Sequence, residues 1–494
     1  MFGRFRLTGP DAAAGPLEVC AANPRYFSAN GTAVYLTGSH IWNNFHDGMG
    51  AGADCVQTRE RMDFNDYLGF LQKHGHNLIR LWRWEHFKSQ AAGGAFHLCM
   101  SPQPWPRIGP ALASDGKPRF DLSQFDKEFF SRLRDRVIAA GERGIYVAVM
   151  FFEGWGLHLS PEPDNVAGHP FFSANNVNDI SIRSIDDYQV LPLNPRVQAL
   201  QEAYIRAVVE AVQDLPNVLY EVANESSGGG VIDASFATAM GFSDVPQWGD
   251  STQWQHWVID VVKHYETGMG YDHHPIGMTM QFPVPDQTRV NETLMHSPAE
   301  WISPGFDDVA HPGDPTNPSR WHADPPTNDG TKVIITDTDH YAPGQADPLW
   351  AWKSFLRGHH PILMDFGLID GPAPAEPSPG APPYAAFEAA RYAMGDTLRF
   401  ARRMDLTRTV PDNELSSTTY ALANPGKEYL VLQPSESAAP FTVSLPPGTY
   451  RVEWFDLTAR ETRSANELTS GGTTTVTPPF EPAGPAVLHL ARTT

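Results

Sequence analysis

Two kinds of segment alternate along the chain up to about Met404. Short apolar runs, rich in β-branched and aromatic residues and without polar alternation, are typical of strands buried on both faces. Such runs occur at Val34–Gly38, Leu78–Glu85, Ile145–Phe152, Val218–Ser226, Pro275–Phe282, Trp301–Ser303, Lys332–Asp337 and Pro361–Asp365. Apolar residues at helical spacing predict helices between them at Phe64–His74, Leu122–Arg143, Asn194–Leu215, Trp254–Tyr265, Trp350–Arg357 and Ala385–Met404. This order of strands and helices predicts a parallel (β/α)8 TIM barrel, an α/β fold.

The pattern changes after Met404, where helical periodicity disappears. The segments "TTYALANP", "EYLVLQP", "FTVSL", "GTYRVEWFD" and "AVLHLA" predict short strands separated by turns, as in an antiparallel β-sandwich. We therefore expect residues 1–404 to form the barrel together with a short N-terminal hairpin extension, whose turn lies at Asn30-Gly31. Residues 405–494 are expected to form an accessory β-sandwich that packs on the barrel.

The composition and charge of the chain favour some classes of binding partner over others. A chain of 494 residues is long enough for a large barrel and a second domain. The formal net charge of −21 argues against nucleic acid and anionic membranes and favours a neutral substrate. The 13 Trp and 15 Tyr provide flat rings of the kind that stack on sugars. The oligomeric state stays open.

The cysteines and the N-terminus bear on location. Cys20, Cys55 and Cys99 are an odd, scattered set, which predicts neither a disulfide framework nor a metal site. The basic start is not followed by the apolar segment of a signal peptide, and no apolar run approaches the ~20 residues of a membrane span. We expect a cytoplasmic protein, unless a leader has been removed from this sequence.

The run Val218–Ser226 carries the clearest chemical signal. It is a buried strand that ends in Asn224-Glu225, and Gly228–Gly230 then breaks the chain into a loop. Burial at a strand end raises the pKa of a carboxyl group, as a general acid near neutral pH requires. A buried Glu satisfied by a neighbouring Arg is the structural alternative.

The motifs "NLIRLW" and "LYEVANES", with the two-domain plan, resemble the retaining (β/α)8 glycoside hydrolases of the cellulase-like clan. The opening "YLTGSHIWNNF" and the C-terminal sandwich look nearest to the apiosidase-like branch of that clan. The resemblance implies that Glu225 is the acid/base, that Asn224 contacts the sugar 2-hydroxyl, and that Arg80 orients the nucleophile. Glu221 is expected to be a structural carboxylate paired with an Arg.

The residue at the position of the catalytic nucleophile differs from the one that this family has. The clan has a Glu at the end of strand seven, whereas Lys332–Asp337 ends in Asp. Asp337 occupies the Glu position by alignment, and Asp339 lies two residues on, on the same face if the strand continues. We rank Asp337 first and Asp339 second. Because Asp is the shorter residue, a retaining and an inverting mechanism both stay open, with retention favoured by the resemblance.

Other polar and aromatic residues follow the predicted strands. Trp82 and Trp301 also stand at or near strand ends with Trp42, Trp84 and Trp155; each one taken singly is expected to belong to the core, but not all five together. The residues expected to contact substrate at this face are His40, Trp42, Asn43, Trp84, Glu85, Glu153, Trp155, Gln281, Asp339, His340 and Asp365.

The sequence predicts a glycoside hydrolase without cofactor or metal. Its long loops favour a pocket for a terminal sugar, with a furanoside as one option. One alternative is a carbohydrate-binding barrel without catalysis. The other is a metal-dependent hydrolase that uses Asp337, Asp339 and His340, whose carboxylate and imidazole groups suit divalent ions.

Overall fold

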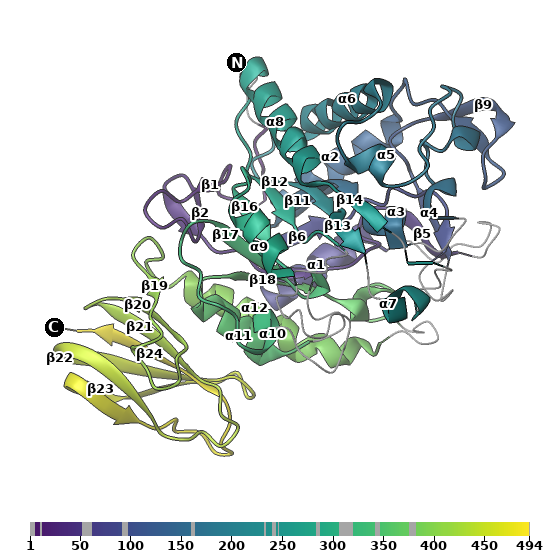
Figure 1. The fold of residues 1–494 in the computed structure, drawn as a ribbon. Helices are drawn as coiled ribbons and strands as arrows, with labels where there is room; N and C mark the ends of the chain where they lie inside the picture. The colour runs from purple at the N-terminus through teal and green to yellow at the C-terminus, as the bar shows by residue number, and fades with distance from the viewer. Residues whose placement is uncertain are drawn as a thin grey trace.

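The structure is a computed structural model of the chain (Figure 1). It describes residues 5–9, 12–51, 62–90, 97–159, 164–231, 234–239, 244–245, 247–282, 287–305, 320–340, 346–374 and 382–493.

Eight parallel strands form one barrel sheet in the spatial order β4, β18, β17, β16, β15, β12, β11, β6. These strands are β4 (Gly38–His40), β6 (Leu78–Leu81), β11 (Tyr146–Glu153), β12 (Val218–Asn224), β15 (Ile276–Thr279), β16 (Trp301–Ser303), β17 (Val333–Asp337) and β18 (His360–Met364). The backbone N–H of Leu78 donates to the carbonyl of Thr37 over 3.1 Å, which brings β6 back beside β4. The residues of these strands are buried, as expected for strands covered on both faces. The predicted TIM barrel is confirmed.

The predicted helices are also confirmed, as α1 (Phe64–His74), α2 (Lys127–Gly141), α6 (Pro195–Val212), α8 (Thr252–Met269), α11 (Pro348–Leu356) and α12 (Glu388–Ala401). Asp63, Asp126, Asn194 and Asp347 precede four of them, and each accepts a backbone N–H of the first turn. These local caps explain why the helices begin close to the predicted residues.

Shorter elements fill the connections. The strands are β1 (Glu18–Val19), β2 (Phe27–Ala29), β3 (Thr32–Val34), β5 (Asp47–Ala51), β7 (Ser89–Gln90), β8 (His97–Ser101), β9 (Arg107–Leu112), β10 (Pro118–Phe120), β13 (Gly228–Val231) and β14 (Gln247–Asp250). The helices are α3 (Trp155–Leu159), α4 (Asp164–Ala167), α5 (Asp186–Gln189), α7 (Ala234–Ala239), α9 (Gln287–Met295) and α10 (Arg320–Ala323). Single 3-10 turns lie at Ser173–Asn175, Thr338–His340, Phe366–Leu368 and Tyr384–Phe387.

The hairpin at the N-terminal side is confirmed, but it changes the first barrel strand. β2 and β3 pair around Asn30-Gly31, both with positive φ (51° and 78°), as a two-residue hairpin turn requires. Val34 pairs with Phe27 in this hairpin. The predicted strand Val34–Gly38 is therefore divided, because its first residue ends β3 and its last residue begins β4.

Trp301 lies in the core of the barrel and not at its aromatic mouth. It is the first residue of β16, and its Nε1 donates to the Tyr220 carbonyl over 3.1 Å. Its ring lies over Gly277, where an added Cβ would stand 2.0 Å from the ring. Leu219 and Val333 belong to the same buried cluster. A three-residue strand places its first residue deep in the barrel and away from the rim.

The C-terminal strands form an antiparallel sheet in the order β19, β20, β21, β24, β22, β23. They are β19 (Val410–Pro411), β20 (Ala421–Asn424), β21 (Glu428–Gln433), β22 (Phe441–Asp456), β23 (Thr462–Val476) and β24 (Ala486–Arg492). A register shift in the long β22 and a bridge from Ser416 to Val443 let the sheet fold back on itself. Tyr429, Phe441 and Trp454 lie in the buried cluster between its halves. The predicted β-sandwich is confirmed.

One face of this sheet packs against α11 and α12 (Figure 1). The Phe455 ring lies 5.9 Å from the Trp352 ring and 5.6 Å from the Phe400 ring, centroid to centroid. The guanidinium of Arg460 binds the carboxylate of Asp396 over 2.7 Å. The prediction that the sandwich packs on the barrel is confirmed, whereas a separate domain at residues 405–494 stays a prediction.

The cysteines differ from the expectation. Cys99 is disulfide-bonded, Cys20 is a buried free thiol, and Cys55 lies outside the described residues. Three scattered cysteines give no spacing that reveals such a bond. Disulfides are typical of oxidising compartments, so this bond does not favour the predicted cytoplasmic location. Among the described residues, no helix is long and apolar enough to cross a membrane.

Candidate active site

Arg80 joins three strand ends inside the barrel. It projects from β6, and its Nη1 donates to Asp337 Oδ2 on β17 over 2.7 Å. Its Nε and Nη2 donate to the two carboxylate oxygens of Glu221 over 2.9 and 2.5 Å, and Nη2 also donates to Asn224 Oδ1 over 2.8 Å. All four side chains are buried. The predicted pairing of Glu221 with an Arg is confirmed, and Arg80 reaches the Asp337 carboxylate as the resemblance implied.

The carboxylate of Asp337 is held on every side by protein. Besides Arg80, it binds His40 Nε2 over 2.6 Å, and its Oδ1 accepts the backbone N–H of Asp339 over 3.0 Å. Burial alone would raise the pKa of Asp337, but its interactions with His40 and Arg80 outweigh burial and hold that pKa well below its usual value. Asp337 is therefore an ionised carboxylate with its oxygens already engaged.

Asp339 does not continue the strand. β17 ends at Asp337, and Thr338–His340 forms a 3-10 turn closed by the hydrogen bond to Asp337 Oδ1. The expectation that both aspartates share a strand face was wrong for this reason. The turn leaves the Asp339 side chain half-buried and brings it toward Glu225. Burial and the neighbouring charge of Asp337 raise the pKa of Asp339 to about 8.

Glu225 follows β12 directly and is buried in a left-handed backbone conformation with φ of 42°. A residue other than glycine held in this region stores strain, which is typical of functional sites. The turn after β11 is packed against this backbone, since a Cβ added to Gly154 would lie 2.6 Å from the Glu225 carbonyl oxygen. Burial first, and then the charges of Asp339 and Glu153, raise the pKa of Glu225 well above its usual value.

Glu225, Asp339 and His340 each present one atom within 4.8 Å of the others, a separation that also suits a metal ion. The hydrogen bonds of His340 argue against this use. Arg80 can only donate, so the atom of Asn224 that it contacts is the oxygen, and His340 Nε2, 3.2 Å from that oxygen, must donate a proton to it. The other ring nitrogen, Nδ1, then accepts from the Ser303 hydroxyl over 2.9 Å. The one lone pair of the neutral ring, on Nδ1, is thus engaged by Ser303, and a cation would have to displace this hydrogen bond.

This arrangement also orients Asn224. Its Oδ1 accepts from both Arg80 and His340, so its Nδ2 is the group left to donate. Among the described residues, that Nδ2 has no hydrogen bond to protein. A donor fixed beside Glu225 is suited to a sugar hydroxyl, as the resemblance implied for Asn224.

Glu153 is a third carboxyl group at this face. It ends β11 in register with Asn224, and its two oxygens accept the backbone N–H of Gly156 over 3.2 and 3.1 Å. Burial raises the pKa of Glu153 to about 8, and its charge raises the pKa of Glu225. Glu153 therefore controls how readily the neighbouring Glu225 loses its proton.

We expect Glu153→Gln to move the alkaline limb of the kcat/KM profile to lower pH. Removing a negative charge near Glu225 lowers the pKa of Glu225, so its acid form is lost earlier as pH rises. The pKa of Asp339 is set by burial and by the charges of Asp337, Arg80 and Glu221, so the acidic limb should change little. An unchanged alkaline limb would contradict the assignment. The exposed Glu210 provides the control variant Glu210→Gln.

Aromatic side chains line the same face. Trp42 and Trp155 are half-buried, and Trp84 lies between them with ring centroids 6.3 and 6.0 Å away. Trp84 Nε1 donates to the Trp42 carbonyl over 2.9 Å, which fixes the cluster. Trp82 is buried behind it, stacked on His40. The structure thus brings Trp42, Trp84 and Trp155 together as expected.

Glu85 is buried in a network of its own. It forms an ion pair with Arg83 and accepts from His169 Nε2 over 3.1 Å and from the Tyr188 hydroxyl over 3.3 Å. Despite burial, these interactions lower the pKa of Glu85. Sequence reasoning missed His169 and Tyr188, because they come from the long segment after β11, whose path no local pattern shows.

Three further residues that were predicted to contact substrate form hydrogen bonds with other groups of the protein. Asp365 binds Arg391 with both oxygens, over 2.6 and 2.8 Å. Gln281 donates to hydroxyl groups at the start of α8, and Asn43 donates to the carbonyl of Ile369. Their predicted contact with substrate stays a prediction, and these bonds give each a structural role.

Solved structures of other proteins share the fold of this chain. No protein-family model matches the chain, and no curated protein matches it. A solved structure described as a glycoside hydrolase is 12% identical, with a TM-score of 0.57 and 97% of each chain covered. A family 5 glycoside hydrolase from Bacteroides vulgatus is 14% identical, with a TM-score of 0.56 over 97% of this chain and 94% of that one. The chain therefore has the fold of known (β/α)8 glycoside hydrolases.

Proposed function

We propose that the protein is a retaining glycoside hydrolase in which Glu225 is the acid/base and Asp339 the nucleophile. The observation that carries the proposal is the facing pair of carboxyl groups, whose nearest oxygens lie within 4.8 Å of each other. Retaining enzymes hold their two carboxyl groups about 5–5.5 Å apart, whereas inverting enzymes leave roughly 6.5–9.5 Å for a water molecule.

The geometry favours Asp339 over Asp337, which the alignment ranks first. A nucleophile needs a carboxylate oxygen with access to the anomeric carbon. Asp337 engages its oxygens with Arg80, His40 and a backbone N–H, whereas Asp339 is half-buried and faces Glu225. Asp337 then supports the site by fixing Arg80 and the turn that presents Asp339.

In this mechanism the ionised Asp339 attacks the anomeric carbon while Glu225 gives its proton to the departing glycosidic oxygen. The resulting glycosyl ester is cleaved when Glu225 takes a proton from a water molecule that attacks the same carbon and releases Asp339. The reaction requires Asp339 to be ionised while Glu225 still carries its proton, and burial together with neighbouring carboxylates raises the pKa of both groups. The acidic limb of activity then belongs to Asp339 and the alkaline limb to Glu225.

The substrate proposed is a terminal sugar on a neutral glycan or glycoside. α3 follows β11 directly and the β13–β14 hairpin follows β12, so both border the carboxyl groups and favour a pocket over an open cleft. A furanoside stays one option, from the resemblance to the apiosidase-like branch.

A panel of 4-nitrophenyl glycosides, including furanosides, tests the proposal. We expect release of nitrophenol from at least one sugar, with the same rate after prolonged treatment with EDTA, because the lone pair of His340 is engaged by the Ser303 hydroxyl. Activity that is lost with EDTA and restored by a divalent cation would support a metal-dependent hydrolase. Binding without turnover of any member would support the non-catalytic alternative.

A further inference from the structure

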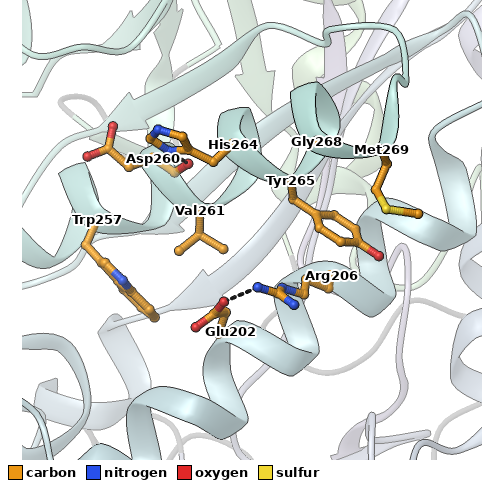
Figure 2. Close-up of a pocket in the computed structure, with 9 residues that line it drawn as sticks. All are labelled: Glu202, Arg206, Trp257, Asp260, Val261, His264, Tyr265, Gly268 and Met269. Atoms are coloured by element: carbon orange, nitrogen blue, oxygen red, sulfur yellow. Dashed lines mark hydrogen bonds and ion pairs between the residues drawn. The ribbon is translucent and has the colours of Figure 1, made fainter.

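A groove of about 500 Å³ runs along the outside of the barrel between α6 and α8 (Figure 2). Trp257, Val261, Tyr265 and Met269 of α8 line it at intervals of four residues, which places them on one face of the helix. Trp257 and Tyr265 are half-buried, and Met269 is 45% exposed. Trp257, Val261 and Tyr265 pack at the edge of the core and keep part of their surface exposed.

The aromatic rings of Trp257 and Tyr265 lie at separate positions along the groove. Trp257 and Tyr265 are eight residues apart, which corresponds to ~12 Å along a helix. Trp257 lies near the start of α8, and the helix follows the β13–β14 hairpin that continues from Glu225. The Trp257 end of the groove is therefore the end nearer to the catalytic face.

Polar groups of both signs border the rings. Glu202 and Arg206 of α6 form an ion pair on one side, and the Arg206 guanidinium lies 5.1 Å from the centroid of the Tyr265 ring. Asp260 and His264 line the groove from α8. Carboxylates accept and a guanidinium donates hydrogen bonds, so this border suits hydroxyl groups. The mixture of charges argues against a polyanion.

Gly268 indicates that the groove is kept open. It lies within α8 beside the groove, and an added Cβ would have no heavy atom within 4 Å. Glycine within a helix is less favourable than alanine. Packing does not require glycine here, and Gly268 is one of the residues that line the groove.

We propose that this groove binds a segment of neutral polysaccharide and holds the polymer beside the enzyme. Flat rings with hydroxyl-directed polar groups at their edges are the chemistry that recognises a sugar chain. The proposal rests on the glycoside hydrolase class proposed above and not on which carboxylate attacks. A second copy of the protein is the competing occupant.

Affinity gel electrophoresis with soluble neutral polysaccharides (mannan, xylan, arabinan and galactan) tests this site in the full chain. We expect at least one polymer to retard the protein. Trp257→Ala should raise the apparent dissociation constant about tenfold, because it removes one buried ring contact. The rate on a small aryl glycoside should stay unchanged. The control is Leu112→Ala, which changes an exposed apolar residue (62%) on β9, outside the groove.

Three results would overturn the proposal. They are no retardation by any of these polymers, equal retardation of Trp257→Ala and the parent protein, and a dimer in solution that Trp257→Ala dissociates. The last result would make the groove a contact between copies. The measurements should be repeated in the Glu225→Gln background, so that loss of turnover, which concerns the catalytic proposal, is read separately from loss of polymer binding.

Discussion

Glu225→Gln should lower kcat on unactivated glycosides by ~10²–10⁴-fold, the usual contribution of general acid catalysis. The amide keeps the size of the side chain but cannot give a proton to the glycosidic oxygen. Folding should be preserved, because glutamine retains nearly the size and the hydrogen-bonding shape of glutamate. Steady-state kinetics on paired substrates with poor and good leaving groups provides the measurement.

The leaving-group dependence separates acid catalysis from a general loss of structure. Nitrophenolate departs without a proton, so formation of the glycosyl ester from nitrophenyl substrates should suffer less. The variant Glu210→Gln, on an exposed helix face, should behave as wild type. Wild-type turnover of an unactivated glycoside by Glu225→Gln would show that another group supplies the proton.

Asp339→Asn should leave almost no activity on any leaving group, because no second carboxylate can form the glycosyl ester. The change is conservative in shape, and the backbone N–H of residue 339 can still donate to Asp337. Circular dichroism and the thermal midpoint should therefore stay near wild type. The rate on an activated glycoside, measured with and without azide, is the informative quantity.

Asp337→Asn provides the matched comparison. It removes a charge from a buried pair with Arg80, a change that typically costs about 3–5 kcal/mol of stability. We expect a lower thermal midpoint together with reduced activity that azide does not restore. Azide rescue of Asp337→Asn, with Asp339→Asn active, would instead return the nucleophile to the residue that the alignment ranks first.

The barrel and the inner part of the site could be predicted from sequence because their signals are local. Buried runs without alternation mark the strands, and Asn224-Glu225 and Arg80 stand within motifs that fix their place on a strand. The pairing of Glu221 with an Arg follows from its place inside a buried strand, where a carboxylate needs a positively charged partner.

Other features depend on three-dimensional detail that short patterns do not contain. Asp339 faces Glu225 because Thr338–His340 forms a 3-10 turn that is closed by the Asp337 side chain. The sequence pattern instead predicted that the strand continues through Asp339. The burial of Trp301 depends on the length of β16 and on the space above Gly277. The disulfide of Cys99 joins parts of the chain whose approach no spacing indicated.

The stereochemistry of hydrolysis tests the central claim most directly. Proton NMR of the first-formed sugar, recorded before mutarotation, should show the same anomer as the substrate for the wild-type enzyme. With azide, Asp339→Asn should yield a glycosyl azide of the opposite configuration, since the anion enters where the carboxylate stood. An inverted product from the wild-type enzyme would contradict the account, because a water molecule, and not Asp339, would then attack the anomeric carbon.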